Sequence, residues 1–451
     1  MKRVLIAATP KQVGKQVLIA GWVEVRRDHG QLIFLNIRDR SGIVQAVVNP
    51  KISAAAHGTA KQLRSEFVAE ISGKVNPRPE NLINKNLPTG AVEIEVKNLR
   101  ILAAAQPLPF DLGSELHLDT YLDHQPIALR SNRDRAIFKI QAAIVASFRE
   151  FLCGEEFVEF QSPKIVAQAA EGGANVFRVQ YFKHKAYLAQ SPQLYKQIMT
   201  GVFERVFTVS NVYRAEPHAT TRHLNEYTSL DYEFAFIKDH TDIMILQRDW
   251  LEHLINYLAK HCAQEIKTLG LTLPKVPKEI PTWKLAEAQA LLKKEFGINA
   301  EGAPDLDPEH ERLICEYAEK KIGSDFVFIT HYPTSKRPFY TYPDERDPET
   351  TKSFDLLFRG VEITTGGRRI NDYEQLLANI EKWGYKRENF SFYLQSFKYG
   401  MPPEGGAATG LERLTQKLCG LENIKQATLF PRDLNRIDLS LSKLKLDDKE
   451  K

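Results

Sequence analysis

Cysteine is scarce in this chain, and long apolar runs are absent. The four cysteines, Cys153, Cys262, Cys315 and Cys419, lie far apart without a CxxC pair, which argues against a structural zinc site and a disulfide framework. No apolar run approaches the length of a membrane span, and the opening MKRVLIAATPKQVG has too short an apolar core for a secretory signal. We therefore expect a cytoplasmic protein that makes no use of a membrane.

Basic residues are unevenly spread along the 451 residues. Residues 1–104 hold 16 Lys and Arg against 8 Asp and Glu, whereas the remaining 347 residues hold 45 against 49. A chain of this length exceeds one ordinary core, so at least two domains are expected. A small basic domain joined to a larger acidic one favours contact with a nucleic acid, although a solvated basic surface would give the same counts.

The first 104 residues have the pattern of β-structure throughout. Five apolar, alternating runs lie between turn-rich pieces: VLIAGWVEV, LIFLNIRD, IVQAVV, FVAEISGKV and VEIEVKNLRIL. Five short strands in about ninety residues fit an OB-type barrel. Such barrels lay single-stranded bases on aromatic faces in a basic groove, and Arg26 and Phe34 supply both side-chain types. Phe34 is equally suited to the barrel core.

Helical patterns appear after the barrel. Ser131 is a candidate N-cap for a helix that runs to about Leu152, because apolar residues recur there at three- and four-residue spacing. Two further helical patterns without convergent chemistry suggest an insertion. The expected organisation is α+β: an OB domain over 1–104, a linker over 105–128, a catalytic domain over 129–437 with an insertion at about 262–323, and a charged, disordered tail over 438–451.

The stretch from Val206 to Phe236 carries the densest chemistry. The runs VFTVSNVY and YTSLDYEFAF predict neighbouring antiparallel strands, joined by a connection longer than the usual hairpin loop of about two to five residues. This loop contains Arg214, Glu216, Arg222 and His223. Arginine forks match phosphate oxygens, and a carboxylate beside them can hold a metal ion or an amine. The loop suits a nucleoside triphosphate, although a solvated hairpin tip carries similar charges.

Two later segments also suit an anionic ligand. Asp355 and Glu362 lie seven positions apart in an extended run, so alternation puts them on opposite faces unless a bulge or bend at Arg359 and Gly360 brings them together. Together they could hold Mg²⁺ against triphosphate oxygens, or they are ordinary polar strand positions. In YGMPPEGGAATGLERL, a glycine-rich loop is expected to open a helix with Arg413 on its first turn, which makes an anion site.

A strand-to-helix junction in AYLAQSPQLYKQIM carries a further polar group. Ser191 is a candidate helix cap, and Gln193 follows it. Lys196 lies in the second turn, where the helix dipole offers it no benefit, so we expect an anionic group to compensate it.

These segments together resemble a known family. YRAE followed by RHLNEY resembles motif 2 of the class II aminoacyl-tRNA synthetases, in the form of the aspartyl, asparaginyl and lysyl subgroup. The helix, strand and proline that end in FVEFQSP resemble motif 1, and YGMPPEGGAATGLERL resembles motif 3, in the same order. Through QSPQLYKQ, RHLNE and GVEITTGG, the chain is most similar to aspartyl-tRNA synthetases of the compact archaeal type.

The resemblance implies an OB domain that grips the tRNA anticodon and a class II catalytic domain, an antiparallel sheet flanked by helices, that forms a homodimer. It implies activation of L-aspartate with ATP and Mg²⁺, then transfer to tRNA-Asp. The implied ATP-binding residues are Arg214, which is catalytic, Glu216, Arg222, His223, Tyr227, Glu362 and Arg413, with Asp355 and Glu362 on the metal. The implied aspartate-binding residues are Glu171, Ser191, Gln193, Lys196, Asp231 and Arg369, and those for the anticodon are Arg26, His29 and Phe34.

The resemblance leaves the tRNA scope and some details open. His29 stands where relaxed forms of the family often carry histidine, which favours tRNA-Asn as a second substrate and a link to an Asp-tRNA-Asn amidotransferase. A solvent-facing loop histidine is the plain alternative. An asparaginyl enzyme, which Lys196 disfavours, and a catalytically silent tRNA-binding paralogue are the competing functions. The chain departs from the common pattern at Gln125, Pro217, Glu404 and Ala408.

Overall fold

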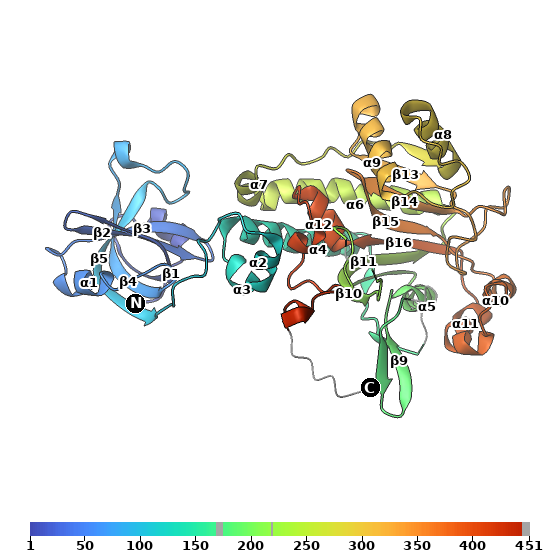
Figure 1. Ribbon diagram of the computed structural model, residues 1–451, viewed down its shortest axis with the longest axis horizontal. Helices are drawn as coiled ribbons and strands as arrows, with labels where there is room; N and C mark the ends of the chain where they lie inside the picture. The colour runs from blue at the N-terminus through green and yellow to red at the C-terminus, as the bar shows by residue number, and fades with distance from the viewer. Residues whose placement is uncertain (168–174, 218–219, 444–451) are drawn as a thin grey trace. The chain divides into compact units, whose positions relative to one another are not determined.

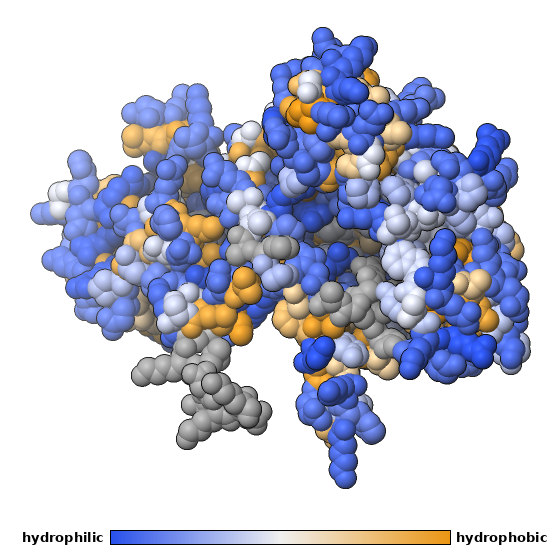
Figure 2. Space-filling view, turned by 45° about the vertical axis from the view of Figure 1, so that its right-hand side comes forward, coloured by the Kyte–Doolittle hydropathy of each residue, from blue (hydrophilic) through white to orange (hydrophobic). Residues whose placement is uncertain are grey.

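The computed structural model describes residues 1–167, 175–217 and 220–443 (Figure 1). The chain divides into two compact units after Ser114. No helix in these described ranges is both long and apolar enough to cross a membrane. Hydrophilic side chains predominate on the face drawn in Figure 2, where hydrophobic ones form separate, smaller patches.

The first unit is a closed five-stranded barrel, which confirms the OB-type prediction. Its strands pair in the order β1-β2-β3-β5-β4. Alternation directs one side chain in two inward, so that in β2 Ile33, Leu35 and Ile37 are buried while Phe34 lies on the outer face, partly exposed. The elements are η1 (Ile6–Gln12), β1 (Gln16–His29), β2 (Leu32–Asp39), β3 (Gly42–Val48), α1 (Ala54–Ala60), β4 (Val68–Pro77), η2 (Glu80–Leu82) and β5 (Val92–Ala103).

The second unit is built on an eight-stranded sheet in the order β12-β13-β14-β15-β16-β11-β10-β6 (Figure 1). Its pairs are antiparallel except β6 with β10 and β12 with β13. The strands are β6 (Val158–Glu159), β10 (Arg205–Tyr213), β11 (Glu226–Ala235), β12 (Thr282–Lys284), β13 (Phe326–Thr330), β14 (Ser353–Phe358), β15 (Val361–Arg368) and β16 (Glu404–Gly410). A small second sheet contains β7 (Ile165–Val166), β8 (Arg178–Tyr181) and β9 (His184–Leu188).

The second unit also contains helices, several of which pack on the large sheet. They are α2 (Leu118–Asp123), α3 (Gln125–Ala128), α4 (Asn132–Gly154), α5 (Gln193–Phe203), α6 (His240–His261), α7 (Ala263–Leu269), α8 (Leu285–Phe296), α9 (Pro308–Tyr317), α10 (Tyr373–Lys382), α11 (Ser391–Lys398) and α12 (Leu411–Leu418). Shorter turns are η3 (Ala318–Ile322), η4 (Arg387–Phe390), η5 (Ile424–Ala427) and η6 (Leu441–Lys443). As predicted, Ser131 caps α4, because its hydroxyl accepts from the Asp134 N–H at 3.0 Å.

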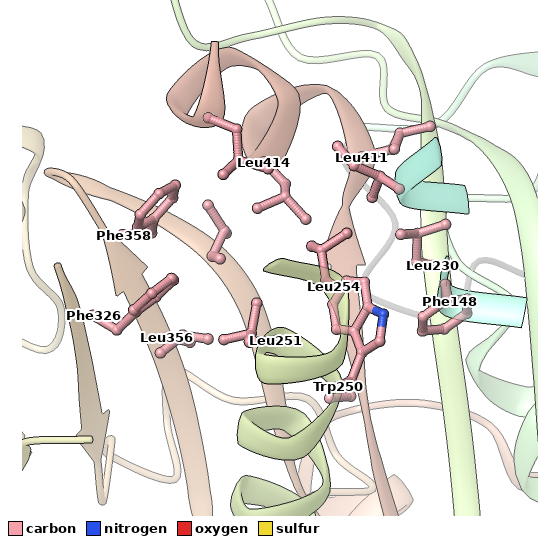
Figure 3. Packing of buried hydrophobic residues seen from close by; sticks show 14 of the residues in the cluster. Phe148, Leu230, Trp250, Leu251, Leu254, Phe326, Leu356, Phe358, Leu411 and Leu414 are labelled. Carbon is pink, nitrogen blue, oxygen red and sulfur yellow. The ribbon is translucent and has the colours of Figure 1, made fainter. Parts of the chain in front are cut away.

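The main core lies between the sheet and helices α4, α6 and α12 (Figure 3). The rings of Phe148 on α4 and Trp250 on α6 meet edge to face with centroids 5.1 Å apart. Phe326 and Phe358 stack across β13 and β14 at 4.5 Å. This packing holds the central strands rigidly, and their other residues form the cavity described below.

One expectation about local structure needs correction. The glycine-rich segment predicted as a loop is strand β16, between β15 and β11, because its glycines let backbones approach closely. A Cβ atom at Gly406 would collide with the carbonyl oxygen of Tyr232. The segment expected as a linker, 105–128, contains α2 and α3. Within the expected disordered tail, Lys443 forms an ion pair with Asp123, and residues 444–451 lie outside the described part of the chain.

Candidate active site

One cavity of about 370 Å³ in the second unit gathers side chains that are far apart in the sequence. Strands β11, β15 and β16 and helices α5 and α12 contribute to its lining, together with loop residues within 190–191, 214–224 and 336–341. Eleven of the residues predicted from the sequence line it: Ser191, Gln193, Lys196, Arg214, Glu216, Arg222, His223, Tyr227, Glu362, Arg369 and Arg413. Asp231 and Asp355 are buried behind this lining, and Glu171 lies outside the described residues.

Two buried cations define one end of the cavity, which we call the amino-acid end. Lys196 Nζ lies 3.1 Å from Asp231 Oδ1 and 3.0 Å from Glu233 Oε2. Arg369 Nε donates to Glu233 Oε1 at 2.8 Å, and its Nη2 donates to the Gly406 carbonyl at 3.0 Å. Each cation is thus fixed by carboxylates of β11, which supplies the anionic partner that Lys196 was predicted to need.

Glu233 is the residue at this end that the sequence analysis missed. Its carboxylate bridges both cations, and its side chain is completely buried. Burial alone would raise the pKa of Glu233, but Arg369 and Lys196 outweigh burial and hold the pKa below its ordinary value. The signal was available, because Glu233 lies two residues after Asp231 in a strand and therefore faces the same side.

The partners of Asp231 and Arg369 differ from those first expected. Arg369 was expected to offer its fork to a ligand, whereas it already bonds Glu233, Gly406 and, at 3.4 Å, Gln193 Oε1. Asp231 pairs with Lys196 through Oδ1. Its buried Oδ2 has no hydrogen-bond partner among the described residues. Ser191 Oγ accepts from the Gln193 N–H at 3.2 Å and so supports the start of α5.

The opposite end, which we call the phosphate end, carries cations that are less buried. Arg222 pairs with Glu311, and His223 Nε2 lies 3.6 Å from Glu216 Oε2. Arg413 Nη1 donates to the Glu362 carbonyl at 3.1 Å and lies 3.5 Å from its carboxylate. The Arg214 guanidinium lies over the Tyr227 ring, 5.7 Å from its centroid. Three arginines and one histidine thus line this part of the cavity.

Glu311 corrects the expectation that the helical insertion contributes no chemistry. It lies on α9, pairs with Arg222 and accepts from the Glu362 N–H at 3.3 Å. Burial raises the pKa of Glu311 to about 7, although Arg222 acts in the opposite direction. The insertion therefore touches the loop that resembles motif 2.

Asp355 and Glu362 are brought together by the hairpin of β14 and β15, so the bend predicted at Arg359 and Gly360 is present, and the strand pairing also contains a bulge between Leu356 and Leu357. Asp355 is on β14, Glu362 is on β15, and the turn between them contains Arg359 and Gly360, both with positive φ. Burial and the neighbouring Asp355 raise the pKa of Glu362. Asp355 Oδ2 lies 2.8 Å from Arg337, which was not predicted, while its buried Oδ1 has no partner within the described ranges.

The carboxylates of Asp355 and Glu362 fit a hard divalent cation that completes its coordination with phosphate oxygens. Magnesium takes one or two protein carboxylates in this way when it binds with a nucleotide. Among the described residues, no three His, Cys, Asp or Glu side chains are grouped to hold a metal by themselves.

The barrel residues predicted to contact nucleic acid lie at the surface, but they differ in how firmly neighbouring groups hold their side chains. His29 ends β1 and is exposed, and Phe34 lies on the outer face of β2. Arg26 is held by Asp28 at 2.6 Å and by the Lys61 carbonyl at 2.8 Å.

Comparisons with known proteins agree with this architecture. Residues 117–434 match the family of tRNA synthetases class II (D, K and N), and residues 17–102 match the OB-fold nucleic acid binding domain. The chain is 46% identical over 439 residues to the aspartate–tRNA(Asp/Asn) ligase of Thermus thermophilus, covering 96% of this chain and 99% of that one. It is 39% identical over 430 residues to the aspartate–tRNA(Asp) ligase of Pyrococcus horikoshii, covering 94% and 96%.

A solved structure shares the fold across the whole chain. The asparaginyl-tRNA synthetase from Pyrococcus horikoshii, complexed with asparaginyl-adenylate, aligns with a TM-score of 0.90 and 30% identity. The alignment covers 97% of this chain and 99% of that structure.

Proposed function

The chain belongs to the tRNA synthetases class II (D, K and N), and on that premise we propose that it is an aspartate–tRNA ligase. It would activate L-aspartate with ATP, release pyrophosphate and transfer the aspartyl group to the 3′ end of tRNA-Asp. The observation that carries this proposal is the pair of buried cations, Lys196 and Arg369, at the amino-acid end of the cavity.

Charge supports aspartate over asparagine. The two amino acids are nearly isosteric, so a pocket separates them by charge and hydrogen bonding and not by shape. An aspartate side-chain carboxylate can accept from both Lys196 and Arg369, which Asp231 and Glu233 hold in place, whereas the amide of asparagine has one acceptor oxygen and would turn its NH₂ donor toward one of these cations. Asp231 Oδ2 would accept from the ligand ammonium group, because this buried oxygen has no partner in the described chain.

The adenylation step needs positioning and charge stabilisation. The aspartate α-carboxylate attacks the α-phosphorus, the bond to the β-phosphate oxygen breaks, and pyrophosphate leaves. Arg214 would stabilise the α-phosphate, while Arg222, His223 and Arg413 would bind the outer phosphates and Tyr227 would stack under adenine. A protein base is unnecessary because the attacking carboxylate is already ionised at neutral pH. In the second step the 3′-terminal ribose hydroxyl attacks the aspartyl carbonyl, and AMP leaves.

Asp355 and Glu362 would hold Mg²⁺ beside the triphosphate, where the ion neutralises phosphate charge. Glu216 would lie near the adenine. Motif-1-like α4 and β6 support a homodimer, and the cytoplasm is the expected compartment because ATP and tRNA are there.

We extend the proposal to tRNA-Asn as a second acceptor. The Thermus thermophilus relative carries Asp/Asn in its name, and His29 is exposed at the end of β1, opposite Leu32, while Phe34 lies two residues further along β2. The anticodons of the two tRNAs differ at one base, so a few contacts from Arg26, His29 and Phe34 of the barrel would decide whether tRNA-Asn is accepted. An enzyme that charges both would supply Asp-tRNA-Asn to an amidotransferase.

Aminoacylation with labelled aspartate or asparagine on separate tRNA-Asp and tRNA-Asn transcripts tests both parts. We expect the wild type to attach aspartate to both tRNAs. His29→Gln should weaken the reaction with tRNA-Asn, and His184→Gln should leave it unaffected. His184 is exposed in the second unit and serves as the matched control. If aspartate is attached to tRNA-Asp alone, tRNA-Asn is not a substrate, but the protein is still an aspartate–tRNA ligase. If asparagine is attached instead, the proposed aspartate–tRNA ligase activity is refuted.

A further inference from the structure

Glu404 is a buried carboxyl group behind the amino-acid end of the cavity that takes no part in the steps above. It begins β16, its side chain is completely buried, and it faces the carboxyl group of Glu233 on β11. Two adjacent carboxyl groups that are both completely buried resist ionising together at neutral pH, because like charges repel strongly in a low-dielectric site. One of the two must therefore keep a proton.

The neighbouring groups determine which carboxyl group is ionised. Glu233 accepts from Arg369 at 2.8 Å and lies 3.0 Å from Lys196, so the negative charge belongs on Glu233. Glu404 Oε1 instead accepts from the neutral side chain of Gln197 at 2.6 Å. Burial and Glu233 raise the pKa of Glu404 well above its ordinary value, and the opposing effects of the Gln197 hydrogen bond and of Arg369 do not reverse this.

Gln197 fixes the orientation of the Glu404 carboxyl group. The Tyr393 hydroxyl on α11 donates to Gln197 Oε1 at 3.1 Å, which turns the amide nitrogen toward Glu404 Oε1. Glu404 Oε2 then has no N–H or O–H donor among the described residues. A proton on Oε2, aimed at Glu233, satisfies both carboxyl groups. Two tyrosines beside these groups, Tyr232 and Tyr393, stay protonated near pH 7, because burial raises the pKa of each well above its ordinary value. Tyr340 lies against Arg369, whose guanidinium is 5.5 Å from the centroid of its ring.

We propose that Glu404 is a positioning residue of the aspartate pocket: as a neutral carboxylic acid it donates a hydrogen bond to Glu233 and so fixes the carboxylate that orients Lys196 and Arg369. This inference rests on the proposed function for its substrate. With Glu404 neutral, the charges of Lys196, Arg369, Asp231 and Glu233 cancel. Ionised Glu404 would add a negative charge behind a pocket that must accept an anionic amino acid.

Two variants of similar volume isolate the hydrogen bond. Glutamine in Glu404→Gln is neutral and can still donate to Glu233, whereas methionine in Glu404→Met fills the space without a donor. In ATP–pyrophosphate exchange we expect E404M to raise the KM for aspartate at least about tenfold, because one buried charge-assisted hydrogen bond is lost. The KM for ATP should change less than about twofold. We expect E404Q to raise the aspartate KM less than about threefold. Equal defects in the two variants would overturn the proposal.

The pH dependence gives a second readout of the proton. As pH rises, wild-type Glu404 ionises and the KM for aspartate should rise, while E404Q has no such group. Aspartate itself titrates in the same way in both assays, so its contribution cancels when the wild-type KM is divided by the E404Q KM. A ratio that increases from pH 7 to pH 10 supports the assignment, and a constant ratio contradicts it.

Unfolding measurements test the same proton without any substrate. A group whose pKa is raised by folding contributes stability that is present below its unfolded pKa and is lost as pH rises toward its folded pKa. Between pH 5 and 7 the unfolding equilibrium constant of the wild type, divided by that of E404Q, should increase about tenfold per pH unit. A flat ratio would refute a neutral Glu404. If the wild type shows no exchange with aspartate, the proposed function fails and this stability ratio still decides the protonation of Glu404.

Discussion

The two ends of the cavity hold their positive charges in different ways. At the amino-acid end, Lys196 and Arg369 are almost completely buried and share the carboxylate of Glu233. At the phosphate end, Arg222 and Arg413 are partly exposed, with single carboxylate partners on neighbouring elements. The first arrangement is fixed before any ligand arrives, whereas the second can exchange its protein carboxylates for phosphates.

The difference follows from what each end must recognise. Discrimination between nearly isosteric amino acids needs charges that cannot move to suit the wrong ligand. Binding and release of a triphosphate and pyrophosphate need cations that can change partners. We therefore expect substitutions at the amino-acid end to affect both stability and activity, and those at the phosphate end to affect mainly activity.

Lys196→Met should produce the largest effect. It leaves Asp231 and Glu233 without the cation between them, and removal of one partner from a buried charge cluster costs about 3–5 kcal/mol of unfolding free energy. Urea denaturation measures this loss. Lys293→Met removes an exposed pair with Glu301 and is the control, with an expected change below about 0.5 kcal/mol. A loss below about 1 kcal/mol for Lys196→Met would contradict the view that this end is fixed by its charges.

Arg214→Ala should separate activity from stability. We expect the rate of aspartate-dependent ATP–pyrophosphate exchange to fall about 10²–10³-fold, because a cation that stabilises transition-state charge is lost. The unfolding free energy should change by less than about 1 kcal/mol, since the residue lies outside the packed core. Arg205→Ala, at the other end of β10, is the control and should leave the exchange rate near that of the wild type. If Arg214→Ala lowered the unfolding free energy as much as Lys196→Met does, the distinction between the two ends of the cavity would be lost.

Glu311→Gln should have the smallest effect and a pH signature. Glu311 competes with phosphate for Arg222, so its neutral replacement should lower the KM for ATP about fivefold at pH 8, the value of an ion pair of about 1 kcal/mol. Burial raises the pKa of Glu311 to about 7, so in the wild type the carboxylate releases Arg222 as pH falls below 7. The KM for ATP should therefore fall from pH 8 to pH 6 in the wild type and stay level in E311Q.

The exposed Glu309 on the same helix gives the control variant, Glu309→Gln, which should follow the wild-type curve. Because folding raises the pKa of Glu311, the stability that this residue contributes is present below its ordinary pKa and is lost as pH rises through 7. A KM for ATP that is independent of pH in the wild type would show that Glu311 does not compete with the nucleotide.

The barrel and the central hairpin could be predicted because alternation within a strand reports directly which face is buried. The runs that became β1 to β5, β10 and β11 carry that alternation clearly. Strand β16 does not, because glycine and alanine give no apolar period, so the same segment suggested a loop. Its place between β15 and β11 depends on close backbone contact, which no local pattern reveals.

The site could be predicted where the charged residues lie within one motif, and not where partners come from distant elements. Arg214, Arg222 and His223 lie on one loop and were predicted together to meet phosphate. Glu311 is 89 residues from Arg222, and no periodicity connects a helix of the insertion with that loop. Glu404 was noted only as a departure from the common pattern, because its contact with Gln197 spans 207 residues.

The most direct test of the central claim is ATP–pyrophosphate exchange by the wild-type protein with L-aspartate and, separately, with L-asparagine. The fixed cations of the amino-acid end predict exchange with aspartate that exceeds exchange with asparagine by at least about 10³-fold in kcat/KM, the discrimination expected when the wrong side chain leaves a buried donor of the site without its acceptor. Equal exchange with both amino acids, or a preference for asparagine, would contradict it.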